Sequence, residues 1–367
     1  MKVAVLGNGQ LGSMLQQAGQ RIGIEVQLLD IDDGELPGPD VLITAEREHW
    51  PTNALTQAVQ NHPEWLNSDA FAVLANRIRQ KNLLNRLGLP SAPWLALSGA
   101  IAQQDIHRQL GPDVFLKRAS GGYDGYGQLR LRQNSRQDLS QWNTEVIAEQ
   151  AINFDREVSI IGARNKAGQT VSYRITENRH VNGILRVSLS QPDSDLALQL
   201  EAERMLNTVM HELNYVGVMA MECFVVNGEL LVNEIAPRVH NSGHWTQAGA
   251  SISQFELHLR AICGLHLPPP EQVGVTVMIN LLGLHYDTTW LRHAAAQLHW
   301  YGKTWRPGRK MGHLNLHHSN PAKLVNWLQE LDLPQEYQAD VQWAVERLNR
   351  AAFLTTEVAP VSDMPFS

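Results

Sequence analysis

Apolar and polar positions along this chain change period several times, and the first part is typical of a parallel sheet. Residues 2–6 (KVAVL) form a short apolar run, which a glycine turn and an amphipathic segment through about Ile22 follow. Two more apolar runs, at 25–30 and 40–45, come next. Because strands alternate with helical patterns here, the sequence predicts an N-terminal α/β domain with right-handed crossovers.

The middle of the chain has a different pattern. A helical segment at 69–88 ends at Gly88-Leu89-Pro90, and several short strands with glycine-rich turns are predicted over 114–162. A polar-faced helix over 195–213 precedes two apolar runs around Asn227-Gly228. Alternating apolar residues on both sides of Asn-Gly predict a β-hairpin.

The last third mixes short strands with helices and completes an α/β and α+β architecture. We expect helices at about 251–263, 321–332 and 338–352, and Pro268-Pro269-Pro270 marks a linker between the first of these and the rest. The polar end of the chain is expected to fray.

Composition narrows the function classes. The chain has 367 residues, is 43% hydrophobic and carries a net charge of −7 without any block of like charge, which gives no support for nucleic-acid or membrane-surface binding. It has neither a signal-peptide pattern nor the run of about 18 apolar residues of a membrane span. The two cysteines, Cys223 and Cys263, are expected to be reduced and buried. We therefore expect a cytoplasmic multidomain enzyme.

The segment from Lys117 to Gln128, KRASGGYDGYGQ, is the most suggestive stretch. It joins two strand patterns by a loop with glycines at 121, 122, 125 and 127. Such a loop lets backbone N–H groups approach phosphate oxygens, and the lysine adds a positive charge. We interpret it as a roof over a polyphosphate; the alternative is a flexible surface hairpin.

Gly7-x-Gly9-x-x-Gly12 matches the dinucleotide-binding fingerprint, with Asp30 where a ribose-binding carboxylate is expected. An NAD-dependent oxidoreductase is therefore an alternative. The motif alone is weak, since the same turn packs any first strand against its helix or accepts another phosphate. No other part of the sequence favours hydride transfer.

Glu222 and Glu234 lie in the two apolar strands that flank Asn227-Gly228. Buried carboxylates are costly unless they are paired or bind a metal, and oxygen ligands beside a polyphosphate suit Mg²⁺. Structural salt bridges are the alternative. A two-residue turn would place the two glutamates on opposite faces and would count heavily against the metal hypothesis. That hypothesis predicts a three-residue loop, 226–228, with Gly228 in the left-handed region, or another loop of the same parity.

Other polar groups complete a candidate site. Glu149 to Ile152 end a strand whose backbone groups suit an adenine edge, and Glu157 suits ribose hydroxyls, although both glutamates also fit a solvated sheet edge. The segment 238–245 (RVHNSGHW) suits a small planar oxyanion, and the basic turn 306–310 (RPGRK) suits a phosphate monoester. The histidines at 313, 317 and 318 invite a zinc interpretation, which the spacing does not favour.

Taken together, these residues resemble the ATP-grasp superfamily and, within it, the N(5)-carboxyaminoimidazole ribonucleotide synthetase family. The motifs that carry the resemblance are GNGQLG at 7–12, ITAE at 43–46, GGYDGYGQ at 121–128, EQAINF at 149–154, GVMAMECF at 217–224, NEIAPRVHNSGHWT at 233–246, SQFELHLRA at 253–261 and RPGRKMGHLN at 306–315. They follow one another over most of the chain.

The resemblance implies an α/β domain at 1–90, an ATP-grasp domain at 91–270 with a lid at about 98–160, a C-terminal domain at 271–355 and a disordered tail at 356–367. It also implies ATP-dependent carboxylation of 5-aminoimidazole ribonucleotide in purine biosynthesis, with bicarbonate as co-substrate, and a homodimer. A ligase for a different amine acceptor is the alternative within the superfamily.

Residue roles follow from the same resemblance. ATP would be bound by Arg77, Lys117, Gly122, Tyr123, Asp124, Gly125, Tyr126, Gly127, Gln128, Glu149, Gln150, Ala151, Ile152, Glu157, His180, Asn233 and Glu234. Magnesium would be bound by Glu222 and Glu234. The ribonucleotide would be bound by Glu46, Tyr123, Asp124, Lys303, Arg309 and Lys310. The catalytic group would be Lys117 with Arg238, His240 and Asn241, the last three around bicarbonate.

One position departs from the family pattern. This chain has Tyr126 where the family usually has Arg or Lys, which removes a charge-assisted hydrogen bond worth about 1.5–3 kcal/mol. Either Arg130 or the basic turn compensates, or the substrate binds less tightly.

Overall fold

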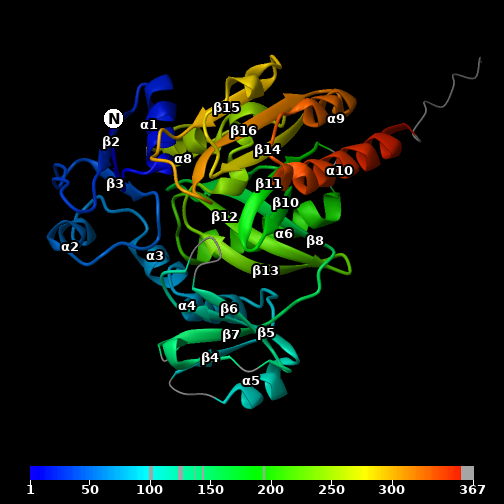
Figure 1. Ribbon diagram of the computed structural model, residues 1–367. Helices are drawn as coiled ribbons and strands as arrows, with labels where there is room; N and C mark the ends of the chain where they lie inside the picture. The colour runs from blue at the N-terminus through cyan, green and yellow to red at the C-terminus, as the bar shows by residue number, and fades with distance from the viewer. Residues whose placement is uncertain (99–101, 123–126, 136, 143, 193–194, 357–367) are drawn as a thin grey trace, which may run out of the picture.

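The computed structural model describes most of the chain (Figure 1). The described residues are 1–98, 102–122, 127–135, 137–142, 144–192 and 195–356, with side chains to residue 350. The predictions for Tyr123, Asp124, Gly125 and Tyr126, and for the tail beyond Thr356, lie outside them. No helix in the described ranges is long and apolar enough to cross a membrane.

The N-terminal part is the predicted parallel α/β unit. Its three strands, β1 (Lys2–Leu6), β2 (Glu25–Leu29) and β3 (Leu42–Ala45), pair in parallel in the order β2-β1-β3. Helix α1 (Gln10–Arg21) connects the first two strands, and α2 (Ala54–Gln60) follows the third. The parallel order brings the loops after β1 and β3 to the same edge of the sheet.

The single helix expected at 69–88 is two helices. They are α3 (Ser68–Leu74) and α4 (Arg77–Arg86). The break occurs because the Asn76 side chain accepts hydrogen bonds from the N–H groups of Ile78 and Arg79, at 3.0 and 3.1 Å, and so caps a new helix. Consequently Arg77 is the first residue of α4.

The described residues between 94 and 150 form a small four-stranded antiparallel sheet, the lid sheet, in the order β4-β7-β5-β6. Its elements are β4 (Trp94–Leu97), α5 (Gln103–Leu110), β5 (Asp113–Arg118), β6 (Gln128–Arg132), a 3₁₀ turn (Ser140–Trp142) and β7 (Val146–Gln150). The glycine-rich loop connects β5 to β6. Figure 1 shows this sheet set apart from the main body of the protein, with α5 on its far side.

The main body is built on a nine-stranded antiparallel sheet among the described residues. Eight strands follow the order β13-β12-β8-β10-β11-β14-β16-β15, and β9 adds to β8. The strands are β8 (Arg156–Arg164), β9 (Thr170–Ser172), β10 (Thr176–Val181), β11 (Ile184–Ser190), β12 (Gly217–Val226), β13 (Glu229–Ala236), β14 (Val275–Leu282), β15 (Ala296–Trp300) and β16 (Lys310–His318). The three C-terminal strands therefore extend this sheet.

Helices cover both faces of the large sheet. Those on one face are α6 (Leu196–Glu212), α9 (Pro321–Glu330) and α10 (Gln338–Thr356), and those toward the other are α7 (Thr246–Gly249) and α8 (Gln254–Ile262). Helix α8 also packs against α1, which joins the N-terminal unit to the main body through a shared apolar core. The polar side chains of the candidate site lie on the face of the large sheet that α8 covers.

Candidate active site

The hairpin β12–β13 brings Glu222 and Glu234 together, by a route different from the predicted one. Its turn is the two-residue Asn227-Gly228, with both residues at positive φ (51° and 83°), and Val226 pairs with Glu229. The predicted three-residue loop is therefore wrong. A β-bulge restores the pairing, because the register shifts after Glu222 and sets Glu222 directly opposite Glu234.

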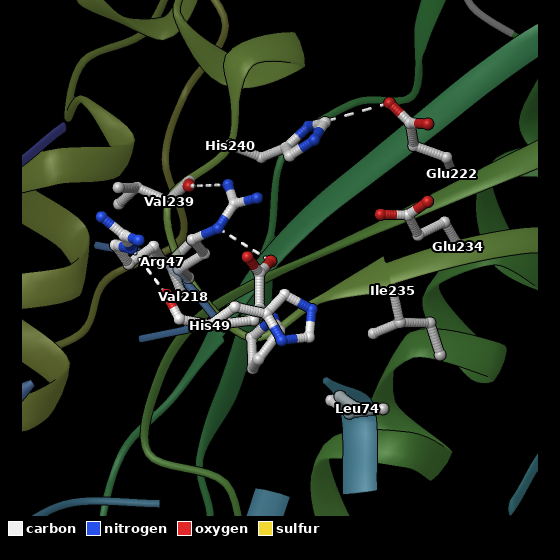
Figure 2. A network of polar contacts seen from close by, with 12 residues as sticks. Arg47, His49, Leu74, Val218, Glu222, Glu234, Ile235, Val239 and His240 are labelled. Atoms are coloured by element: carbon white, nitrogen blue, oxygen red, sulfur yellow. Dashed lines mark hydrogen bonds and ion pairs between the residues drawn. The ribbon is translucent and has the colours of Figure 1, made fainter. Parts of the chain in front are cut away.

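The bulge leaves Asn233 unpaired in the ladder between β12 and β13. Its side-chain oxygen lies 3.5 Å from Lys117 Nζ, on β5 of the lid sheet. The residue that shifts the register thus also connects the hairpin to the lid. Figure 2 shows the carboxylates of Glu222 and Glu234 side by side and pointing to the same side of the sheet.

Two histidines flank Glu222. His180 Nε2 and His240 Nδ1 each lie 3.8 Å from Glu222 Oε1, and His180 Nδ1 is hydrogen-bonded to Glu157. Burial raises the pKa of Glu222; the charge of His180 opposes this, and those of Glu234 and Glu157 add to it. A pair of carboxylates in which one resists ionisation is the environment that a cation stabilises.

The carboxylates of Glu222 and Glu234 also limit how a metal ion could bind at this site. Among the described residues, no group of three or more His, Cys, Asp or Glu side chains is arranged to hold a metal ion. Mg²⁺ commonly takes one or two protein carboxylates and completes its shell with phosphate oxygens and water. The pair at Glu222 and Glu234 fits that mode of binding.

A buried charge cluster joins the lid sheet to α4. The Glu149 carboxylate forms ion pairs with Lys81 on α4 through one oxygen and with Lys117 on β5 through the other. Burial disfavours ionisation of Glu149, but Lys117 and Lys81 outweigh it and hold its pKa below the ordinary value. The pKa of the Lys81 ammonium is lowered by burial, against the attraction of Glu149. Glu149 therefore positions Lys117.

The backbone after Glu149 is less available than the sequence suggested. The N–H groups of Gln150 and Ala151 donate to the carbonyls of Pro93 and Asp113, at 2.9 and 3.0 Å. Hydrogen bonds within the lid therefore already use these two N–H groups. That the backbone of Glu149 to Ile152 binds an adenine edge stays a prediction, and it would use the other backbone groups of that segment.

The glycine-rich loop is held at its base by Arg77. Gly121 and Gly127 adopt positive φ, 80° and 72°, which explains glycine at these two positions. The Arg77 guanidinium donates to the carbonyls of Arg118 (3.1 Å) and Gly122 (3.4 Å) and lies 3.5 Å from Glu234. Arg77 thus links the loop to the carboxylate pair.

The GNGQLG turn already contains an anion from the chain itself. Glu46, which follows β3, accepts hydrogen bonds from the N–H groups of Gly9 (2.5 Å) and Gly12 (2.7 Å). A Cβ atom at Gly7 would lie 2.4 Å from the Glu46 carboxylate. Because these N–H groups are the ones that would bind a pyrophosphate, the dinucleotide alternative loses its anion site. Asp30 is hydrogen-bonded to Asn8.

Of the predicted ribonucleotide contacts, Lys303 lies beside this turn, where its ammonium donates to Gln10. Arg309 donates to the carbonyl of Thr304 at 2.9 Å. Lys310 begins β16, and its charge acts on Glu222 and His180.

Arg130, one of the groups suggested to compensate for Tyr126, is already paired within the lid sheet. The guanidinium of Arg130, on β6, makes a two-pronged contact with Asp113, on β5, and its Nε lies 2.9 Å from Oδ1. The suggested compensation by Arg130 is therefore not supported.

The segment after β13 holds several polar groups in place. Arg238 Nε lies 2.8 Å from Glu48 Oε1. Burial, Arg238 and Lys310 hold the pKa of His240 well below its ordinary value. The N–H of Ser242 donates to His240 Nδ1 at 3.3 Å, so the neutral ring carries its proton on Nε2. The side-chain atoms of Asn241 are buried without a hydrogen-bond partner among the described residues.

Next to this segment, three neutral histidines stack in a column. The rings of His299, His313 and His244 lie 4.5 and 4.6 Å apart, and burial lowers the pKa of each. His317 instead contacts Thr276, and His318 packs on Trp327. The structure does not bring together the histidines of the zinc interpretation.

Three residues of the site were not predicted from the sequence: Lys81, Glu48 and His49, whose ring accepts a hydrogen bond from Gly121. Lys81 could have been found, because it lies four residues after Arg77 on one helix face. The contacts of Glu48 and His49 depend on distant segments and left no local signal.

The lid is an antiparallel sheet that bears Lys117 and a glycine-rich loop, and it faces a carboxylate pair on a larger antiparallel sheet. This arrangement defines an ATP-grasp enzyme. Comparison with known proteins agrees with this class: an ATP-grasp domain model matches residues 82–255, and a phosphoribosylaminoimidazole carboxylase C-terminal domain model matches residues 276–326.

Among individual proteins, N5-carboxyaminoimidazole ribonucleotide synthase of Escherichia coli (strain K12) is 51% identical over 94% of this chain and 98% of its own length. The crystal structure of the synthetase from Thermus thermophilus has a TM-score of 0.82 at 36% identity, covering 90% of this chain and 99% of that one. The chain belongs to the N5-carboxyaminoimidazole ribonucleotide synthase family of ATP-dependent carboxylating ligases.

A third similar structure carries ligands. The synthase from Aspergillus clavatus, in complex with ADP and 5-aminoimidazole ribonucleotide, has a TM-score of 0.78 at 26% identity and covers 94% of this chain and 98% of that one.

Proposed function

We propose that this chain carries out the reaction for which its relatives are named. It would join bicarbonate to the exocyclic amine of 5-aminoimidazole ribonucleotide, with ATP converted to ADP and phosphate. The observation that carries the proposal is the hairpin: its bulge pairs Glu222 with Glu234, directs Asn233 to Lys117 and leads directly into Arg238, His240 and Asn241. The groups proposed to bind phosphate are therefore adjacent to those proposed to bind bicarbonate.

The first chemical step would be attack by a bicarbonate oxygen on the γ-phosphorus of ATP, which breaks the bond to ADP and forms carboxyphosphate. Lys117, positioned by Glu149, would neutralise charge on the phosphate oxygens, and Arg238 would orient bicarbonate. Magnesium, bound by Glu222 and Glu234, would neutralise further negative charge on the triphosphate. His240, neutral, would donate a hydrogen bond from Nε2 without adding charge.

In the second step, the amine nitrogen would attack the carboxyl carbon, or carbon dioxide released from the intermediate. Phosphate departs with the bicarbonate oxygen that attacked ATP, and the nitrogen loses a proton. Phosphorylation is needed because the carbonyl of bicarbonate is anionic and a poor electrophile. Closure of the glycine-rich loop would keep water away from carboxyphosphate.

The acceptor would lie between the GNGQLG turn and the C-terminal strands. Glu46 would meet its ribose, and Lys303 and Arg309 its phosphate. Arg309→Ala should raise the KM for the ribonucleotide about ten- to a hundredfold, because a hydrogen bond to a charged group contributes about 1.5–3 kcal/mol. The KM for ATP should change less than twofold. Steady-state kinetics with each substrate varied in turn measures both.

The matched control for this prediction is Arg292→Ala, which removes an exposed arginine from the same part of the chain. If the two KM values rise together in Arg309→Ala, Arg309 does not bind the acceptor phosphate.

The reaction itself is tested by omitting one substrate at a time from a coupled assay of ADP release. We expect full release only with ATP, bicarbonate and the aminoimidazole ribonucleotide, and no replacement of bicarbonate by formate. Equal release with a different amine acceptor would favour another ATP-grasp ligase.

Four further statements belong to the same proposal. The enzyme would require Mg²⁺, act as a homodimer and work in the cytoplasm. Its chain would divide near residues 90 and 270, with a lid that ends before β8 rather than at the expected residue 160, because β8 belongs to the main sheet. Metal dependence of ADP release and the mass of the particle in solution test the first two.

A further inference from the structure

The segment that follows β3 reaches three parts of the candidate site with side chains from four consecutive residues, 46–49. Glu46 occupies the GNGQLG turn, Glu48 pairs with Arg238, and His49 contacts the glycine-rich loop. Figure 2 shows Arg47 and His49 close together, on the side toward which the carboxylates of Glu222 and Glu234 point.

Glu48 fixes the orientation of Arg238. The Nε to Oε1 distance is 2.8 Å, and both side chains are mostly buried, with 16% and 17% exposed. The Arg238 Nη1 group also donates to the carbonyl of Val239 at 3.1 Å. Contacts on two edges determine the plane of the guanidinium, and planar alignment is what two-pronged binding of a carboxylate-like anion requires.

His49 holds the start of the glycine-rich loop. Its Nε2 accepts a hydrogen bond from the N–H of Gly121 at 3.2 Å, and Gly121 has a positive φ of 80°. The segment itself is held by Arg47, whose Nε donates to the His49 carbonyl at 2.6 Å. Since Arg77 donates to the carbonyl of Gly122, the first residues of the loop are held by two side chains, those of His49 and Arg77.

We propose that Glu48 and His49 are positioning residues that align the bicarbonate-binding arginine and the glycine-rich loop with the acceptor pocket at Glu46. One short segment then sets the relative placement of all three reactants. The inference rests on the proposed function, because it takes Arg238 to bind bicarbonate.

The first test is Glu48→Gln, which keeps the shape of the side chain and removes its charge. We expect the KM for bicarbonate to rise about tenfold, equivalent to about 1.4 kcal/mol, with the KM for ATP changed less than twofold. The matched control is Glu25→Gln, since Glu25 forms an exposed ion pair with Lys2 at 3.5 Å and lies outside the site. Thermal unfolding of each variant checks that the fold is retained.

Arg238→Ala distinguishes failure of the proposed bicarbonate site from failure of the positioning role of Glu48. If Arg238→Ala leaves the KM for bicarbonate unchanged, the proposed role of Arg238 fails, and this inference fails with it. If Arg238→Ala raises that KM and Glu48→Gln does not, only the positioning role of Glu48 is overturned.

The second test compares His49→Ala with His49→Gln, whose amide oxygen can still accept from Gly121. We expect His49→Ala to form severalfold more ADP per carboxylated product, because a misplaced loop lets water reach carboxyphosphate. His49→Gln should restore the wild-type ratio. Wild-type coupling in His49→Ala, or equal loss in both variants, would overturn the hydrogen-bonding role.

Discussion

Replacing Glu234 with glutamine is expected to lower kcat for ADP formation by about two to three orders of magnitude, as loss of one preorganised charge-stabilising group does elsewhere. The protein should remain folded, because the Glu234 side chain is 48% exposed and its contact with Arg77 is 3.5 Å long. An exposed ion pair of this kind contributes about 0–1 kcal/mol to stability. Stopped-time assays of ADP and thermal unfolding measure the two effects separately.

The same strand supplies the control for this variant. Glu229, at the start of β13, is exposed and lies at the turn, so Glu229→Gln makes the same chemical change away from the carboxylate pair. We expect its activity to equal that of the unmodified protein. A Glu234→Gln enzyme with a normal rate would show that Glu234 takes no part in magnesium or phosphate binding.

Replacing Glu149 with glutamine is expected to lower the free energy of unfolding by about 3–5 kcal/mol, because it leaves buried lysine charge uncompensated. Lys81 has only 3% of its side chain exposed, and Glu149 has 5%. ATP binding should weaken as well, since Lys117 loses the partner that positions it. Urea unfolding and nucleotide titration measure the two losses, and Glu145→Gln, at an exposed residue before β7, is the control.

Glu149 also predicts a dependence of stability on pH. Its folded pKa is below the ordinary value of 4.5, so the unfolded chain takes up its proton first as the pH falls. The contribution of Glu149 to stability is therefore complete above about pH 4.5 and declines below it as the pH approaches the folded pKa. Glu149→Gln should lose this part of the acid sensitivity. An unchanged pH profile would mean that the ion pairs with Lys81 and Lys117 do not stabilise the fold.

Sequence reasoning located the functional hairpin correctly and failed on its register. The Asn-Gly turn was recognisable because both residues adopt positive φ with little cost. The parity argument correctly required Glu222 and Glu234 to share a face, but it attributed the necessary shift in register to the turn. The shift comes instead from a bulge at Asn233, and a bulge depends on pairing with both neighbouring strands, which local sequence does not encode.

The N-terminal unit and the helices were predictable for a different reason. Their hydrophobic periods are local, and α6 and α8 begin and end within three residues of the predicted limits. The helix expected at 69–88 was wrong because its period continues through Asn76, whose capping side chain interrupts it. A polar residue that caps a helix and one that lies on an exposed face look alike in sequence.

Long-range polar contacts were the least predictable part of the site. Glu149 was expected to face a nucleotide, yet its carboxylate is buried between Lys81 and Lys117, 68 and 32 residues away. Glu46 was expected to contact the acceptor, and its occupation of the glycine turn was not foreseen. Partners so distant in sequence are set by how the domains pack, which no local pattern reports.

The account depends on attack of bicarbonate on the terminal phosphate of ATP, between the loop that contains Gly121 and the hairpin that bears Glu222. Mass spectrometry of the phosphate released with ¹⁸O-labelled bicarbonate tests this step directly. We predict one labelled oxygen in the phosphate for each ribonucleotide carboxylated, because the attacking oxygen leaves with phosphorus. Unlabelled phosphate, formed with full carboxylation, would contradict the account.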